Sequence, residues 1–305
     1  MSLGWTDPLL LFAFDHRNSF RKLLDVSPDA GDTGRSRVLL AKRLVFDGFL
    51  AGVDRLDDTT GAAILVDEQY GAELVPLARE RGALVAMPVE KSGQRAFELE
   101  YGSEFAAHVG RFDPDFVKVL VRYNPGGDAE LNARQNAALR DVSRWCNDNG
   151  RRFLLEYLLP PTDDQLARVD GSRDRFDDEI RPALMPEVVE QMQDAGVEAD
   201  VWKVEGLDRP GDDAAVSAMA RRDGRGDVGC VVLGRGASLA RVADWLRAGA
   251  GVPGYVGFAV GRSIWTHALT EHLGGRMERD VAVDEIGANY AGLVETWREG
   301  VASAE

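Results

Sequence analysis

Several features that would place this chain in a membrane, outside the cell or on nucleic acid are missing from its 305 residues. The first residues lack the basic stretch, apolar run and cleavage site of a secretory signal, and no apolar run approaches membrane-spanning length. The two cysteines, Cys146 and Cys230, have neither metal nor redox spacing, so we expect reduced thiols. A net charge of −15 argues against nucleic acid or a polyanionic membrane as a partner. We therefore expect a cytoplasmic protein with a small-molecule ligand, and the sequence leaves a homo-oligomer open.

Histidine is scarce as well. Of the four histidines, His108, His267 and His272 fall in helical patterns, which leaves only His16 at a predicted strand end. A catalytic zinc site needs several such ligands together, so no metal is predicted. The first predicted strand is not followed by the Gly-x-Gly-x-x-Gly turn of a dinucleotide fold, and no other cofactor is predicted.

Lysine is the most informative shortage, because the chain has five lysines and 31 arginines. Two of the five, Lys118 and Lys203, lie inside apolar runs typical of β-strands. Arginine stays protonated in proteins, whereas a desolvated lysine can lose its proton and form a Schiff base with a carbonyl group. Lysine at these two positions therefore indicates carbonyl chemistry that arginine cannot perform.

Short apolar runs alternate with longer amphipathic stretches along the chain. Strands are predicted over 9–14, 62–66, 84–87, 116–121, 153–158, 201–204, 229–233 and 255–259. Helices are predicted near 34–52, 68–81, 100–110, 129–149, 183–195, 212–222, 238–248 and 262–273, with an extra C-terminal helix near 283–300. Eight units in strict alternation predict a parallel sheet that most simply closes into a (β/α)8 TIM barrel, a single domain over residues 1–305. An open, doubly wound sheet is the alternative.

One long segment, residues 160–182, shows no regular pattern and is rich in Asp, Arg and Pro. A loop of this length in a compact domain is usually functional or mobile. Because it follows a predicted strand, it falls on the catalytic face of a barrel. We therefore interpret it as a loop that covers the substrate.

Ionisable residues gather where the predicted strands end, which is where the active site of a barrel lies. Burying so many charges is costly unless they are paired or used in chemistry. The residues at or after these strands are Asp15, His16, Arg17, Asp67, Glu68, Glu90, Lys91, Lys118, Arg122, Glu156, Lys203 and Glu205.

The loops after the seventh and eighth strands predict a phosphate site. Glycines allow a close approach of the backbone to an anion, helix amino termini offer free N–H groups, and arginine adds a bidentate contact. The residues concerned are Gly234, Arg235, Gly236 and Ser238 in one loop and Gly261, Arg262 and Ser263 in the other.

Each of these residues also has a structural alternative. Lys203 can pair with Glu205 or Glu156, Lys118 can serve only to tune the other lysine, and Asp15 can cap a helix. The remaining structural expectations are that His16 is hydrogen-bonded at the barrel mouth, Asp67-Glu68 starts a helix, Lys91 is exposed, and Trp202 and Trp265 pack in the core. Two strand lysines with Glu156 on a neighbouring strand favour chemistry over structural pairing.

Five segments together resemble the class I sugar-phosphate aldolases related to tagatose-1,6-bisphosphate aldolase. They are residues 12–17 (FAFDHR), 117–123 (VKVLVRY), 155–156 (LE), 202–205 (WKVE) and 257–262 (GFAVGR). Within that group, Asp15-His16-Arg17 and residues 122–125 (RYNP) are most similar to the 2-deoxy-5-keto-gluconate 6-phosphate aldolase-like family of inositol catabolism. Tagatose-type enzymes usually carry Gln where this chain has His16.

The resemblance implies a role for each matching residue. Lys203 matches the Schiff-base lysine, Lys118 a second lysine whose charge keeps the first one neutral, Glu156 the acid/base for the substrate hydroxyl, and Asp15 a carboxylate that contacts substrate hydroxyls. Substrate binding is expected from His16, Arg17, Arg122, Gly234, Arg235, Gly236, Gly261 and Arg262, with Arg262 at the phosphate.

The implied activity is metal-independent cleavage of a ketose phosphate. The implied substrate is 2-deoxy-5-keto-gluconate 6-phosphate, which gives dihydroxyacetone phosphate and malonate semialdehyde. Two alternatives stay open: an aldolase for another ketose phosphate such as tagatose-1,6-bisphosphate, and a sugar-phosphate sensor that binds without turnover.

Overall fold

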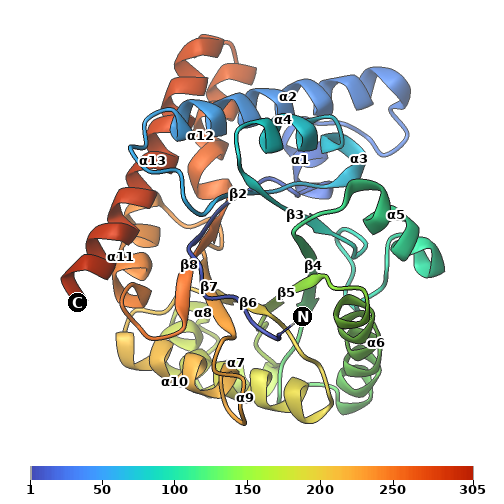
Figure 1. The fold of residues 1–305 in the computed structure, drawn as a ribbon, viewed down its shortest axis with the longest axis vertical. Helices are drawn as coiled ribbons and strands as arrows, with labels where there is room; N and C mark the ends of the chain where they lie inside the picture. Colours follow the sequence, from blue (N-terminus) through green and yellow to red (C-terminus); the bar gives the residue numbers. More distant parts are fainter. Residues whose placement is uncertain (1, 305) are drawn as a thin grey trace.

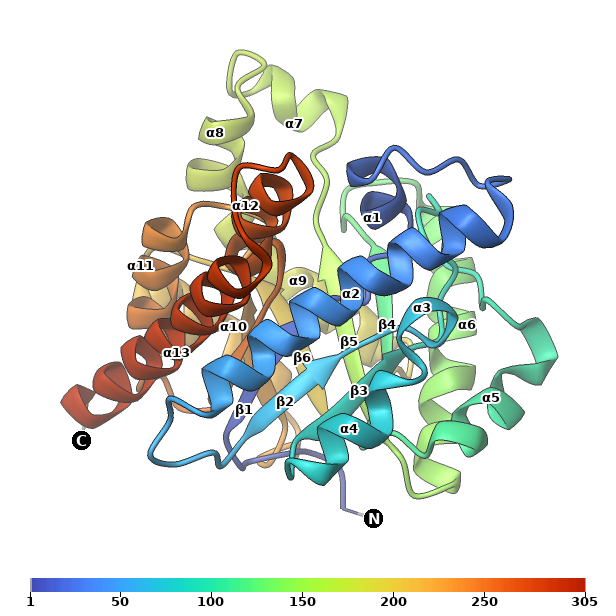
Figure 2. The same ribbon diagram turned by 90° about the horizontal axis from the view of Figure 1, so that it is seen from above.

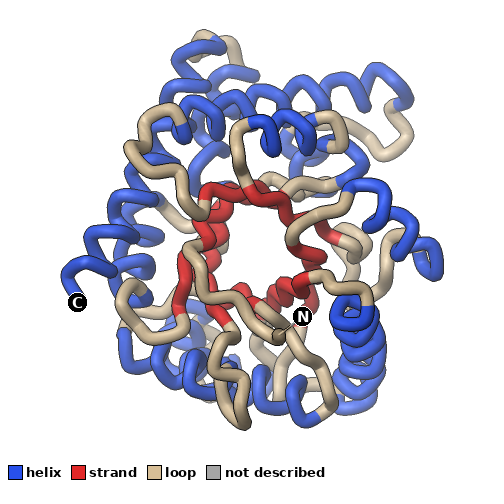
Figure 3. Tube along the Cα trace, in the orientation of Figure 1, coloured by secondary structure: helices blue, strands red, loops and turns tan. Residues whose placement is uncertain are grey.

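Eight parallel strands form one closed barrel in the computed structural model, which describes residues 2–304. They are β1 (Leu9–Ala13), β2 (Ala62–Leu65), β3 (Leu84–Pro88), β4 (Phe116–Arg122), β5 (Arg152–Leu158), β6 (Val201–Glu205), β7 (Gly229–Leu233) and β8 (Tyr255–Val260). Each strand pairs with the next along the chain, and β8 closes the ring on β1. Figure 1 and Figure 3 show this ring inside a ring of helices. The predicted (β/α)8 barrel is confirmed, and the open sheet is excluded.

The outer ring contains most of the predicted helices within a few residues. They are α2 (Gly31–Val53), α3 (Glu68–Gly71), α4 (Leu74–Glu80), α5 (Phe105–Phe112), α6 (Ala129–Asp148), α9 (Arg181–Asp194), α10 (Pro210–Ala220), α11 (Leu239–Gly249), α12 (Arg262–Leu273) and the C-terminal α13 (Arg279–Ala304). The predicted helix 68–81 is wrong in one respect, because it is broken between α3 and α4. Pro76, in the first turn of α4, has no N–H to continue a hydrogen-bond ladder from α3. None of the helices within residues 2–304 is both long and apolar enough to cross a membrane.

Three short helices and one π-turn were not predicted. They are α1 (Asn18–Leu23), α7 (Asp163–Ala167), α8 (Arg173–Arg175) and the π-helix η2 (Phe176–Ile180), and a 3-10 turn, η1 (Gly102–Glu104), precedes α5. The expectation of an irregular segment over 160–182 is therefore wrong. Thr162 and Gln165 form a reciprocal capping box that starts α7. Elements of three to six residues are too short to produce a helical periodicity in the sequence.

The lower part of the barrel interior is filled by apolar side chains. Leu9, Leu11, Phe116, Leu154, Val201 and Val231 belong to this layer and are fully buried. We call this layer the apolar floor. It makes the barrel a packed core rather than a pore, so the polar groups at the carboxyl ends of the strands lie on an apolar layer that excludes water.

Two glycines allow close contacts, one between the strands that close the barrel and one between two helices of the outer ring. Gly257 of β8 lies so close to β1 that a Cβ atom there would sit 2.0 Å from the Leu9 carbonyl oxygen. Gly52 of α2 brings that helix against α13, where a Cβ atom would lie 2.9 Å from the Gly287 carbonyl oxygen. The closing seam of the barrel and its largest helix pair both depend on positions without a side chain.

Candidate active site

A cavity of about 560 Å³ opens at the carboxyl ends of the strands. Figure 2 shows α7 and α8 extending beyond this end of the barrel on one side, with α1 on the other. The structure brings together at this cavity every residue predicted to be catalytic or substrate-binding, except Ser238 and Ser263 of the predicted phosphate loops. The residues at the cavity are Asp15, His16, Arg17, Lys118, Arg122, Glu156, Lys203, Gly234, Arg235, Gly236, Gly261 and Arg262.

Strand alternation explains why these ionisable groups meet. Side chains two residues apart on a strand point to the same side, so a residue two positions beyond the apolar floor also points into the barrel. The pairs that follow this rule are Phe116 with Lys118, Leu154 with Glu156, and Val201 with Lys203. Each of these three strands thus supplies an apolar residue to the floor and an ionisable residue to the cavity.

Lys118 lies at the centre of three carboxyl groups. Its Nζ atom is 2.7 Å from Glu90 Oε1, 2.9 Å from Asp15 Oδ2 and 3.3 Å from Glu156 Oε2, and the side chain is only 2% exposed. Burial acts to lower the pKa of Lys118, but the three carboxyl groups outweigh it and hold the pKa above its ordinary value. Lys118 is therefore a fixed positive charge in the site.

Lys203 and Glu156 lie on adjacent paired strands. Lys203 Nζ donates to Glu156 Oε2 at 2.9 Å, and both side chains are buried. Burial raises the pKa of Glu156, but the charges of Lys203 and Lys118 outweigh burial and hold it below the ordinary value. Glu156 is thus an ionised acceptor shared by two amines, which suits it to accept a proton.

Asp15 and His16 form the β1 side of the site. Burial acts to raise the pKa of Asp15, but Lys118 and His16 hold it well below its usual range. Burial lowers the pKa of His16 to about 4, although the neighbouring Asp15 carboxylate opposes this shift. His16 is therefore neutral at pH 7, and its Nδ1 atom is buried without a hydrogen-bond partner among residues 2–304. This atom is available to a ligand.

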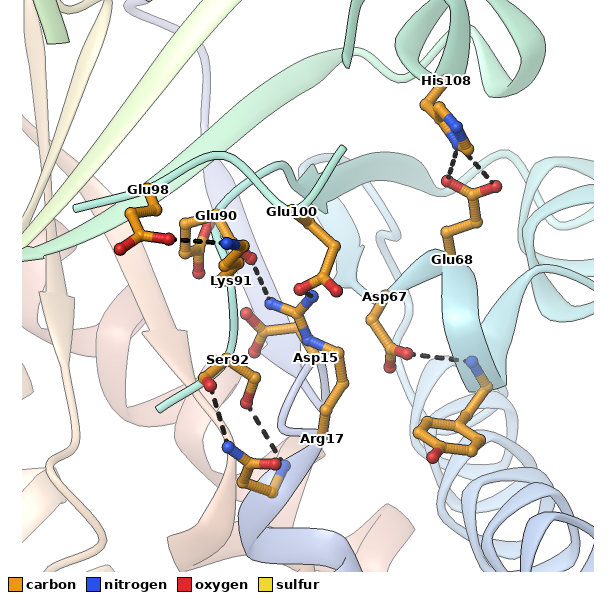
Figure 4. A network of polar contacts seen from close by, with 12 residues as sticks. Asp15, Arg17, Asp67, Glu68, Glu90, Lys91, Ser92, Glu98, Glu100 and His108 are labelled. Atoms are coloured by element: carbon orange, nitrogen blue, oxygen red, sulfur yellow. Dashed lines mark hydrogen bonds and ion pairs between the residues drawn. The ribbon is translucent and has the colours of Figure 1, made fainter. Parts of the chain in front are cut away.

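Arg17 has a structural role that the sequence did not reveal. Its Nη2 atom donates to the Glu90 carbonyl oxygen at 2.5 Å, and its Nη1 atom to Glu100 Oε2 at 3.0 Å, as Figure 4 shows. Backbone hydrogen bonds between Lys91 and Glu98 and between Glu100 and Val89 close the same loop on itself. Arg17 thus holds the 89–100 loop against the strand ends, and the guanidinium is largely occupied by this contact.

Glu90 is the site residue that the sequence reasoning left unassigned. It is 5% exposed, lines the cavity and bonds Lys118 through Oε1, while Oε2 is buried without a hydrogen-bond partner among residues 2–304. Burial raises the pKa of Glu90 despite the opposing charge of Lys118. The spacing along the strand could have identified Glu90 as an inward-facing residue. Ala86 points into the barrel, and Pro88 and Glu90 follow it at intervals of two residues, so they face the same side.

The predicted phosphate site is formed by the loops after β7 and β8. Gly234, Gly236 and Gly261 line the cavity, and Arg262 Nη2 donates to the Arg235 carbonyl oxygen at 3.1 Å. Arg262 makes no ion pair within residues 2–304, so its charge is available to an anion. Ser238 instead caps α11 and does not line the cavity. It therefore adds nothing to the predicted phosphate site.

Arg235 is committed to protein carboxylates. It lies 2.7 Å from Asp177 Oδ2 and 2.9 Å from Glu205 Oε1, and its backbone φ is 52°. Positive φ is uncommon for a residue with a side chain and is typical of functional sites. Since Asp177 belongs to η2, this contact fastens the segment between β5 and α9 to the phosphate side of the cavity.

The remaining structural expectations also have clear outcomes. Asp67 caps α3 by accepting from Tyr70 N, Lys91 is exposed and pairs with Glu98, and Trp202 and Trp265 are buried. Arg122 is exposed at the cavity edge, where it donates to the Gln94 carbonyl oxygen at 2.7 Å.

The side chains that line the cavity have an excess of positive charge, whereas the chain as a whole is negatively charged. Nine Lys or Arg and five Asp or Glu residues line it, although the chain carries −15. No group of three or more metal-ligating side chains is arranged to hold a metal ion in the part of the chain described. The lining thus favours an anionic ligand.

The fold and this lysine–carboxylate cavity define a barrel protein with the layout of a ligand-binding or catalytic site at its strand ends. The family model described as "Uncharacterized protein conserved in bacteria (DUF2090)" matches residues 4–301, and the chain belongs to this family. A search of the curated proteins gives no match.

Solved structures with the same fold include two aldolases. An archaeal fructose 1,6-bisphosphate aldolase aligns with a TM-score of 0.56 and 14% identity, over 96% of this chain and 94% of that one. A fructose-bisphosphate aldolase from Slackia heliotrinireducens aligns with a TM-score of 0.55 and 17% identity, over 93% and 86%. Cgl0159 from Corynebacterium glutamicum aligns with a TM-score of 0.61 and 15% identity, over 95% and 86%. At these identities the likeness establishes the fold.

Proposed function

We propose that this protein is a class I aldolase, a carbon–carbon lyase that cleaves a ketose phosphate through a Schiff base on Lys203. The observation that carries the proposal is the contact chain from Lys203 through Glu156 to Lys118, with Asp15 on the far side of Lys118. A buried amine beside an ionised carboxylate and a fixed ammonium is the combination that imine chemistry requires. Support also comes from the names of two structures with this fold, both fructose-bisphosphate aldolases.

The reaction begins when the neutral amine of Lys203 attacks the substrate ketone. Loss of water from the carbinolamine gives a protonated imine, which withdraws electrons from the adjacent carbon–carbon bond. Glu156 then takes the proton of the hydroxyl on the departing carbon, the bond breaks, and an aldehyde leaves. The enamine that remains is protonated at carbon and hydrolysed to release the ketone product.

The phosphate end of the substrate would bind beside Arg262. This side chain has no carboxylate partner within residues 2–304, and the neighbouring loops carry Gly234, Gly236 and Gly261. The amino terminus of α12 adds backbone N–H groups and the positive end of a helix dipole. Binding energy at this remote group would hold the ketone over Lys203.

For the substrate itself we propose 2-deoxy-5-keto-gluconate 6-phosphate, with malonate semialdehyde and dihydroxyacetone phosphate as products. The sequence around Asp15-His16-Arg17 and residues 122–125 supports this choice. Tagatose-1,6-bisphosphate and fructose-1,6-bisphosphate are the competing substrates. Cleavage of all three, measured with a coupled assay for dihydroxyacetone phosphate, would rank them by kcat/KM. We propose a cytoplasmic enzyme of sugar-phosphate metabolism, and the assay requires no added cofactor.

The first experiment is borohydride trapping with dihydroxyacetone phosphate, followed by peptide mass spectrometry. We expect a reduced adduct on Lys203 in the wild type and in Lys91→Arg, whose lysine is exposed and paired with Glu98. The Lys203→Arg variant should form no adduct and lose turnover while it keeps its circular dichroism spectrum. Near-wild-type cleavage by Lys203→Arg would overturn the proposal. Binding of the phosphate ligand without an adduct in the wild type would identify a sensor instead.

A further inference from the structure

Three carboxyl groups surround the ammonium group of Lys118, which is more negative charge than this one cation can neutralise. Asp15, Glu90 and Glu156 all lie within 3.3 Å of the single ammonium group of Lys118. Like charges held this close cannot all ionise easily in a buried site, so one carboxyl group is expected to carry a proton. The identity of that group decides which residue can act as an acid.

Contacts distinguish Glu90 from the other two. Glu156 Oε2 accepts from both Lys203 and Lys118, and Asp15 is bonded to Lys118 with His16 beside it, so both are held as anions. Glu90 meets only Lys118 through its side chain, and its Oε2 atom is buried with no hydrogen-bond partner in the described part of the chain. A buried carboxylate oxygen without a donor is costly, whereas the neutral acid form reduces that cost.

The directions of the pKa shifts agree with this assignment. The pKa values of Asp15 and Glu156 are held low, mainly by the lysines against the opposing effect of burial, whereas burial raises that of Glu90. Titratable groups whose pKa values are driven apart in one site are the usual acid and base of a mechanism.

The backbone around Glu90 is built to hold this side chain in place. Arg17 donates to its carbonyl oxygen at 2.5 Å, and an isolated β-bridge joins Glu90 to Leu99. Three contacts connect Glu90 to Lys203: Glu90 to Lys118 at 2.7 Å, Lys118 to Glu156 at 3.3 Å, and Glu156 to Lys203 at 2.9 Å. Glu90 is therefore placed in the same cavity as the reacting carbon, on a rigid support.

We propose that Glu90 is a catalytic acid that protonates the enamine carbon, an inference that rests on the proposed function. The enamine carbon takes the proton of Glu90, so a C–H bond forms and the O–H bond of the acid breaks. The nitrogen lone pair of Lys203 completes the C=N bond of the iminium, and Glu90 is left as a carboxylate. Water hydrolyses the iminium, and Glu90 recovers its proton from solvent. In reverse, the Glu90 carboxylate removes a proton from the hydroxymethyl carbon of bound dihydroxyacetone phosphate.

The reverse step gives an assay that needs no aldehyde substrate. In D₂O, the wild type should exchange the hydroxymethyl proton of dihydroxyacetone phosphate for deuterium, which NMR follows directly. Glu90→Gln keeps the shape of the side chain and can still accept from Lys118, but it cannot carry the acid proton. We expect this variant to form the borohydride adduct on Lys203 and to exchange at least about 100-fold more slowly. Glu90→Asp, which retains an acid, should recover part of the rate.

The matched control is Glu98→Gln, an exposed residue of the same loop whose side chain pairs with Lys91 outside the reacting groups. It should exchange at the wild-type rate. Exchange by Glu90→Gln within about threefold of the wild type, or loss of both adduct and exchange in that variant, would overturn the assignment. Absence of the adduct in the wild type would instead overturn the proposed aldolase, so the two failures are distinguishable.

Discussion

Replacing Lys118 by methionine should destabilise the barrel strongly at neutral pH. Methionine has a similar length, so the substitution removes the charge and keeps most of the volume. The ammonium group it removes is 2% exposed and contacts Asp15, Glu90 and Glu156 at 2.9, 2.7 and 3.3 Å. Removing one partner of a buried ionic cluster costs about 3–5 kcal/mol, because the other charges are left unpaired. At roughly 2 °C per kcal/mol for a large domain, Tm should fall by about 6–10 °C.

The loss of stability caused by Lys118→Met should be smaller at acidic pH than at pH 7. In the wild type the pKa values of Asp15 and Glu156 are depressed, so their contribution to stability is complete above the unfolded values of 3.8 and 4.5 and is lost only at lower pH. Without Lys118 the folded-state pKa values of these carboxyl groups move upward. The folded variant then binds protons as pH falls from 7 to 5 and gains stability relative to the wild type.

Thermal unfolding followed by circular dichroism at pH 7 and pH 5 measures both effects. Lys91→Met is the control, because its exposed ion pair with Glu98 contributes about 0–1 kcal/mol. If Lys118→Met melts within 2 °C of the wild type at pH 7, or loses as much at pH 5 as at pH 7, the account of Lys118 as a buried charge centre is refuted.

Three further predictions concern single residues. Burial lowers the pKa of His16 to about 4, whereas the unfolded ring binds its proton near 6.5, so the wild type should lose stability as pH falls from 6.5 to 4. Urea unfolding at pH 7 and at pH 4.5 measures this loss, and for His16→Gln the loss of unfolding free energy between the two pH values should be smaller by about 2 kcal/mol. Gly257→Ala should cost at least about 3 kcal/mol in the same assay, because its Cβ atom would lie 2.0 Å from the Leu9 carbonyl oxygen. Gly226→Ala, where a Cβ atom would meet no atom within 4 Å, should be near neutral, and equal stability of the two variants would refute the close contact between β8 and β1. Arg262→Ala should weaken binding of dihydroxyacetone phosphate at least about tenfold in calorimetry without changing Tm, and unchanged affinity would remove Arg262 from the phosphate site.

The strands and most of the helices could be predicted because both depend on local pattern. Parallel strands buried on both faces read as continuous apolar runs, and strict alternation with helices leaves few topologies open. Lys118, Glu156 and Lys203 could be predicted for the same reason, since each interrupts such a run at a position that must face the interior.

Partners between distant segments could not be predicted. Arg17 and Arg235 were expected to contact the ligand, yet their guanidinium groups mainly contact Glu90, Glu100, Asp177 and Glu205, which lie far away in the sequence. Lys42 shows the same limit: it lies within α2, where a helical pattern gives no sign of burial. In the structure it is fully buried, donates to the Phe14 carbonyl oxygen at 2.7 Å and pairs with Asp67. This third buried lysine could not be predicted from lysines in strand-like runs, because it lies in a helix.

The apolar floor has a kinetic consequence. Because Leu11, Phe116 and Val201 fill the barrel below the reacting groups, the cavity has no second exit through the barrel axis. In the proposed reaction, both products must then leave through the mouth by which the substrate enters, and the product joined to Lys203 can leave only after the free aldehyde. Release is therefore ordered, and product inhibition should reveal the order: the ketone phosphate should compete with the substrate, whereas the aldehyde should inhibit noncompetitively.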